Sequence, residues 1–105
     1  MDNNKDNIKI ELNELVNQGL IISYTISPIE ISILSLERME ISIETDFISY
    51  YKLISIKIEE ERKCYNEYFE CFEQLLCKFS GKYNERFNNL LIEKLNSINK
   101  NEINN

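Results

Sequence analysis

The stretch that decides the fold is residues 28–58, PIEISILSLERMEISIETDFISYYKLISIKI, and its apolar residues can be grouped in two ways. Steps of three or four residues, starting at Ile29 and continuing to residue 79, meet apolar or aromatic side chains everywhere except at Glu40 and Glu61. The mean step is about 3.6 residues, which is the period of an α-helix. This pattern predicts a long central helix over residues 28–79.

A capping motif supports a helix that begins at this point. Ser27 can accept a hydrogen bond as the N-cap, Pro28 suits the first helical position, and Glu30 completes the capping box. An unbroken helix would be about 78 Å long at 1.5 Å per residue, which is long for so small a monomer. We therefore expect either a break near Asp46, which could cap a second helix, or a rod whose apolar face needs a second chain.

Alternating apolar and polar residues in the same stretch favour strands instead. Such runs occur at 29–33, 39–43 and 54–58, and their Ile and Ser residues have low helix propensity. However, residues 20–65 contain neither Gly nor Asn, so the usual hairpin turns would lack their preferred residues. Independent strands would also have no reason to keep one helical phase. We favour the helix and keep an α+β fold, with strands between residues 20 and 58, as the alternative.

Outside this stretch the sequence predicts two further helices. Apolar residues at helical spacing indicate a helix over about 7–19, and Gly19 fits a left-handed C-cap. A last helix is expected over about 82–98, after Ser80 and Gly81 end the preceding segment. It would place these apolar residues on one side: Tyr83, Phe87, Leu90, Leu91, Leu95 and Ile98.

The expected architecture is therefore all-α. It is a helical hairpin or bundle with antiparallel neighbours joined by short turns. A chain of 105 residues is long enough for one domain at most, so we expect a single helical domain over residues 1–105. Residues 1–7 and 99–105 are polar and are expected to be frayed tails.

Composition and charge argue against some classes of function, namely binding to nucleic acids or to membranes. The net charge is −6 and the pI is near 4.7, which disfavours phosphate binding and anionic membrane surfaces. No apolar run is long enough to span a bilayer, and the polar N-terminus does not resemble a secretory signal, so we expect a cytoplasmic protein. The abundance of Ile, Asn and Lys without any Ala, His or Trp is typical of AT-rich coding DNA, such as that of mobile elements.

Residues with catalytic chemistry are scarce. The chain has no His, and its two glycines are too far apart to form a phosphate-binding loop. The three cysteines, at positions 64, 71 and 77, do not form a CxxC pair, and an odd number without a signal sequence indicates reduced thiols. We therefore expect no enzymatic activity, no metal site and no cofactor.

Tyrosines beside the apolar stripe are the strongest candidates for a binding surface, because tyrosine is enriched at interface hot spots. We expect a non-enzymatic inhibitor or neutraliser of a basic protein partner, similar in kind to immunity proteins, antitoxins or phage anti-defence proteins such as anti-CRISPRs. A homodimer is possible, and a small DNA-associated transcriptional regulator is the alternative function. The candidate partner-binding residues are Tyr50, Tyr68, Glu60, Glu67 and Glu70.

Overall fold

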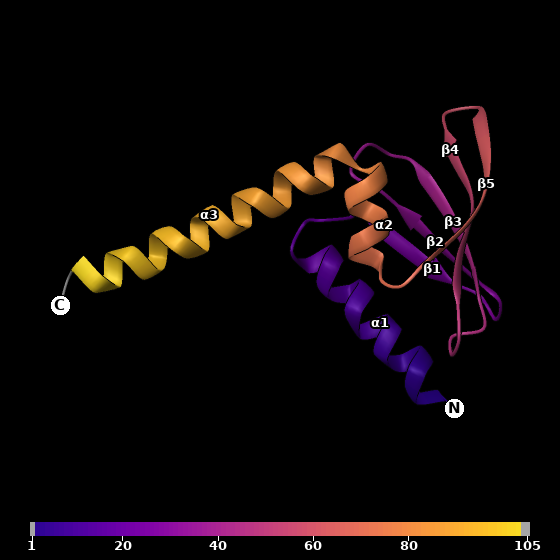
Figure 1. Cartoon of the computed structure of the whole chain (residues 1–105), viewed down its shortest axis with the longest axis horizontal. Coiled ribbons are helices and arrows are strands. Elements are labelled where there is room, and N and C mark those ends of the chain that lie inside the picture. The colour runs from indigo at the N-terminus through magenta and orange to yellow at the C-terminus, as the bar shows by residue number, and fades with distance from the viewer. Residues whose placement is uncertain (1, 104–105) are drawn as a thin grey trace.

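The computed structural model of the chain describes residues 2–103, with side chains for residues 4–97. One five-stranded antiparallel sheet, in the order β1-β2-β3-β4-β5, forms its centre. Helices α1 and α2 pack on the sheet, whereas α3 projects away from the body (Figure 1). In chain order the elements are α1 (Asp2–Asn17), β1 (Ser23–Ile26), β2 (Glu30–Leu34), β3 (Glu40–Thr45), β4 (Tyr51–Ile58), β5 (Glu61–Phe69), α2 (Phe72–Phe79) and α3 (Gly81–Ile103).

The predicted all-α bundle is wrong, and so is its central helix over residues 28–79. Four strands occupy most of that region, and only its last part, α2, is helical. The α+β alternative describes the class of the fold correctly, although its strands continue past residue 58 to Phe69. Residues 20–27, which precede the predicted central helix, contain the first strand.

Cross-strand pairing of isoleucines explains why strands form here. Ile31 lies opposite Ile43, and Ile33 lies opposite Ile41, with all four side chains completely buried under the helices. Burying each such side chain stabilises the fold by about 1.5–3 kcal/mol, and β-branched residues pack well on a pleated surface. Part of the apparent helical phase arises because a step of four residues, unlike a step of three, also returns to the same face of a strand.

The turns show why the lack of Gly and Asn was misleading. Arg38, Phe47 and Glu59 take left-handed backbone conformations with φ of 68°, 64° and 56°, one in each of the three hairpin turns from β2 to β5. This conformation costs a non-glycine residue about 1–2 kcal/mol. The buried isoleucine pairs outweigh that cost, so tertiary packing overrides the local turn preference.

Polar side chains that were expected to cap helices instead stabilise two of the turns. Ser27 and Pro28 lie in the turn between β1 and β2, where the Ser27 backbone N–H and hydroxyl both donate to the Glu30 carbonyl, at 2.8 and 3.1 Å. Asp46 lies in the turn between β3 and β4, and its carboxylate accepts hydrogen bonds from the backbone N–H groups of Ile48 and Ser49. A hydrogen bond from the Ser49 hydroxyl, together with these N–H groups, lowers the pKa of Asp46.

Replacing Glu59 by glycine is expected to stabilise the protein by about 1 kcal/mol. Glycine adopts a positive φ without the steric penalty that Glu59 bears in the two-residue turn between β4 and β5. The free energy of unfolding, measured by urea denaturation, checks this. Glu60→Gly is the matched control, because Glu60 is in the same turn without a positive φ, and it is expected to destabilise. Equal effects of the two substitutions would contradict the strain argument.

The ends of the chain agree better with the sequence. The C-cap prediction for Gly19 is confirmed, because its φ is 74°. The two hydrogen bonds of a Schellman motif close the end of the helix. The Gly19 N–H donates to the Val16 carbonyl, and the Leu20 N–H donates to the Leu15 carbonyl. Of the residues expected to be tails, 2–7 belong to α1 and 99–103 to α3. Residues 1, 104 and 105 lie outside the described part of the chain.

Candidate protein-interaction surface

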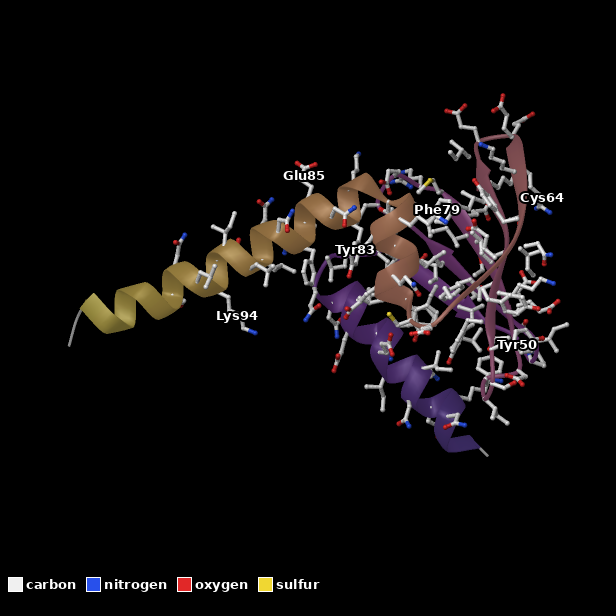
Figure 2. All side chains as sticks on the ribbon, viewed as in Figure 1. Tyr50, Cys64, Phe79, Tyr83, Glu85 and Lys94 are labelled. Atoms are coloured by element: carbon white, nitrogen blue, oxygen red, sulfur yellow. The ribbon has the colours of Figure 1, made fainter. Side chains whose placement is uncertain are left out.

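The first third of α3 anchors the helix to the body. Tyr83 is almost completely buried, and burial raises its pKa to about 12. Phe87 stacks on Tyr83 with ring centroids 5.9 Å apart, and Leu90 is half-buried against the core. Arg86 donates from Nε to the Gln18 carbonyl at 3.2 Å, which ties α3 to the end of α1. Figure 2 shows Tyr83 turned toward the other helices and Glu85 turned away from them.

A carboxylate from the turn between β2 and β3 caps the start of α3. Ser80 is the N-cap, and its hydroxyl oxygen accepts the backbone N–H of Tyr83 at 3.1 Å. Glu37 accepts the Ser80 hydroxyl at 2.7 Å and the backbone N–H of Lys82 at 2.9 Å. Burial would raise the pKa of Glu37, but the hydrogen bonds outweigh it and lower the pKa. The negative charge also suits a helix N-terminus, so Glu37 fixes where α3 leaves the body.

Replacing Glu37 by alanine is expected to reduce the free energy of unfolding by about 1 kcal/mol at neutral pH, because two polar groups at the helix start lose their acceptor. The folded pKa of Glu37 is lowered from 4.5, so its contribution is complete above that value and is lost as the pH falls through the folded pKa. Urea unfolding of the wild type and the variant, at neutral and acidic pH, should therefore show a difference that shrinks in acid. Glu37→Gln is the control that keeps the hydrogen-bond acceptor without the charge. A difference between wild type and Glu37→Ala that stays constant with pH would contradict this role.

The rest of α3 carries an apolar stripe that nothing in the described chain covers. Leu91, Ile92 and Leu95 are 44%, 53% and 58% exposed, and all side chains of residues 91–97 are exposed. The Cα radius of gyration is 15.9 Å, against about 13 Å expected for a compact domain of this length, which reflects the projecting helix. Clustered exposed apolar residues on a protruding helix mark an interaction surface. Lys94 lies on the same free segment (Figure 2).

Two of the residues predicted from the sequence lie together, near the end of the sheet at which β3 meets β4. The rings of Tyr50 and Tyr68 are 6.0 Å apart in an edge-to-face arrangement, and Tyr68 is 67% exposed. The Tyr50 hydroxyl donates to Glu44 at 3.0 Å, and this hydrogen bond raises the pKa of Tyr50. Lys52 Nζ lies 5.9 Å from the Tyr68 ring centroid. These aromatic side chains form a second candidate surface.

The three predicted glutamates do not join this tyrosine pair. Glu60 lies in the turn between β4 and β5, and Glu70 lies between β5 and α2, where its backbone N–H donates to Gln74. Glu67 is on the helix-covered face of the sheet and pairs with Lys78 of α2 at 3.1 Å. That pair borders a pocket of about 300 Å³ between β5 and α2. The predicted five-residue site is thus not one surface.

The stripe on α3 was visible in the sequence but was assigned to packing. Helical spacing placed Leu91 and Leu95 on the same side as Tyr83, and a helix of unknown surroundings is expected to bury its apolar side. The position of each apolar residue along α3 distinguishes the buried part of the stripe from the exposed part. Among the apolar residues of α3 whose side chains the structure describes, only Tyr83, Phe87 and Leu90 are near enough to the body to be covered by it.

Cys64, Cys71 and Cys77 are free, exposed thiols, and Figure 2 shows Cys64 pointing away from the helices. Among the side chains that the structure describes, those of residues 4–97, no group of three or more His, Cys, Asp or Glu is placed to hold a metal ion. None of the described helices combines the length and apolar character needed to cross a membrane.

Comparison with known proteins identifies the family. The GSKIP domain matches residues 16–98, which include part of α1, the whole sheet, α2 and most of α3. Neither the curated proteins nor the solved structures contain a match to this chain. GSKIP domains are known as protein-interaction modules, so the partner of this chain is a protein. Because the match covers well over half of its residues, the chain belongs to the GSKIP domain family.

Proposed function

We propose that this chain is a non-enzymatic protein-binding module that inserts the free part of α3 into an apolar groove of its partner and inhibits the partner by occupying that groove. The observation that carries the proposal is the exposed stripe of Leu91, Ile92 and Leu95. An amphipathic helix that lies in a groove uses anchors at spacings of three and four residues, as these leucines and isoleucine do.

The base of α3 supports the same function. The Glu37 cap and the buried Tyr83 hold the helix in one direction, so less conformational freedom is lost on binding. The net charge of −6 favours a partner with a basic surface around its groove, because complementary charge speeds association and excludes wrong partners.

The charge pattern of the sheet gives no support to a DNA-binding regulator. On its open face, Lys52 lies opposite Glu44 and Lys57 lies opposite Glu40, so acidic and basic side chains alternate between β3 and β4. Duplex DNA binding needs a continuous basic surface, which these rows lack.

A photo-reactive amino acid placed at position 95 tests the proposal. We expect illumination in an extract of the source organism to attach a protein to position 95 but not to position 29. Ile29 is the matched control, since it is an apolar residue in the turn between β1 and β2 and is even more exposed than Leu95. Attachment only at position 29, or at neither position, would exclude α3 as the binding element. Purified partner can then be assayed with and without the chain, and unchanged partner activity would exclude inhibition.

A further inference from the structure

Strand β5 presents a long open edge. It is the last strand of the sheet and, with nine residues, the longest, whereas the opposite edge strand β1 has four. Its side chains are exposed except for the half-buried Tyr65 and Phe69. An edge strand leaves every second backbone N–H and C=O group without a partner in the sheet, and such a row can pair with another strand.

Side chains on the two faces of β5 are arranged symmetrically about Tyr65. On the helix-covered face, Lys63 and Glu67 lie opposite the buried Ile56 and Leu53, two residues to either side of Tyr65. On the open face, Arg62 and Tyr68 lie opposite Lys57 and Lys52, three residues to either side. Tyr65 itself packs edge-to-face against Phe79 of α2 at 5.2 Å. Two pairs of positions equidistant from Tyr65, 63 with 67 and 62 with 68, thus hold complementary side chains.

We propose that β5 pairs antiparallel with β5 of a second copy of this chain, about a two-fold axis at Tyr65, so that two five-stranded sheets form one continuous sheet. In this register Lys63 of each copy faces Glu67 of the other, and Arg62 faces the ring of Tyr68. Opposite charges and cation–aromatic contacts across strands are stabilising. An isologous interface of this kind produces a closed dimer rather than a fibre.

Other registers of the β5–β5 pair are less favourable, even those that keep the helix-covered faces of the two sheets on the same side. An axis at Cys64 would place Glu61 opposite Glu67, and an axis at Glu67 would place that residue opposite itself. Like charges directly opposite each other are destabilising. An axis at Asn66 would place Lys63 opposite Phe69 and lose its ion pair. Charge complementarity therefore selects the register centred on Tyr65.

The partner that this edge binds is thus a second copy of the chain, and the inference does not depend on what α3 binds. In sedimentation equilibrium the wild type is expected to approach about 25 kDa, twice the chain mass of 12.5 kDa, as the concentration rises. Lys63→Glu and Glu67→Lys should each weaken the dimer at least about tenfold, because each creates two like-charge pairs. An equimolar mixture of the two variants should dimerise again, since the two acidic side chains of one variant then face the two basic side chains of the other.

Lys78→Ala is the control for the ion pair within one chain, because Glu67 also contacts Lys78. It should leave the dimer intact, and circular dichroism should show that all variants are folded. A wild type that stays near 12.5 kDa at every concentration would overturn the proposal. So would a dimer that both charge reversals leave unchanged, or a mixture of the two variants that fails to dimerise while the wild type does.

A cross-link tests the register independently. In the proposed pairing Cys64 faces Asn66 of the other copy, so Asn66→Cys in a Cys71→Ser, Cys77→Ser background should form a disulfide-linked dimer under mild oxidation by diamide. Asn84→Cys in the same background is the matched control, since α3 lies outside the proposed interface. Cross-linking of the control to the same extent, or none at position 66, would exclude the register centred on Tyr65.

Discussion

Replacing both Leu91 and Leu95 by glutamate is expected to weaken binding to the partner protein by at least about 100-fold. Each leucine is an exposed anchor, and loss of an apolar anchor at the centre of an interface costs on the order of a factor of ten or more. Glutamate also has to be desolvated if it enters an apolar groove. Titration calorimetry with the partner identified by cross-linking at position 95 measures the change.

The matched control replaces Ile29 and Ile48 by glutamate. Both isoleucines are more exposed than the two leucines and lie in turns of the sheet, far along the chain from α3. We expect this control to retain the affinity of the wild type and the Leu91, Leu95 variant to retain its helical circular dichroism. A similar loss of affinity in both would show that general surface charge, rather than the α3 stripe, determines binding.

Replacing Leu76 by alanine is expected to reduce the free energy of unfolding by about 2–5 kcal/mol. Leu76 is completely buried at the centre of α2, and truncating such a side chain removes its transfer free energy and leaves a cavity. Domains of this kind are stabilised by about 5–15 kcal/mol in total, so this loss is a large part of the whole. Urea denaturation followed by circular dichroism measures the difference.

Leu91→Ala is the corresponding control, because Leu91 is an exposed leucine on a helix of the same protein. We expect its free energy of unfolding to stay within about 0.5 kcal/mol of the wild type. Comparable losses for Leu76 and Leu91 would mean that α3 is covered in the isolated protein. The exposed stripe would then not be free to bind a partner.

Together these two variants separate stability from binding. Leu76 belongs to the core that α1, α2 and the sheet share, whereas Leu91 and Leu95 make no contribution to that core. The Glu37 cap links the two parts, since it joins the turn between β2 and β3 to the start of α3. An intact body is therefore needed to hold α3 in place, although the binding residues lie outside it.

The candidate surface was only partly predictable from the sequence. Tyr50 and Tyr68 were singled out for their residue type, and the structure places their rings in contact. The glutamates were predicted to share a surface with these tyrosines, but alternation along β5 directs Glu67 and Tyr68 to opposite faces of the sheet. The wrong assumption of a helix changed which residues share a face.

The sequence by itself determined features that depend on neighbouring residues. These include the helical ends of the chain and the Gly19 C-cap, because propensity and capping act within a few residues. The acidic net charge follows from the composition alone. Tertiary structure decided the rest. The strand pairs, the left-handed turn at Arg38 and the cap that Glu37 gives to α3 depend on contacts between distant parts of the chain. Burial of the paired isoleucines supplies the free energy that overrides the local preference for a helix and for Gly or Asn in the turns. This burial depends on strand pairing, so it cannot be read from neighbouring residues alone.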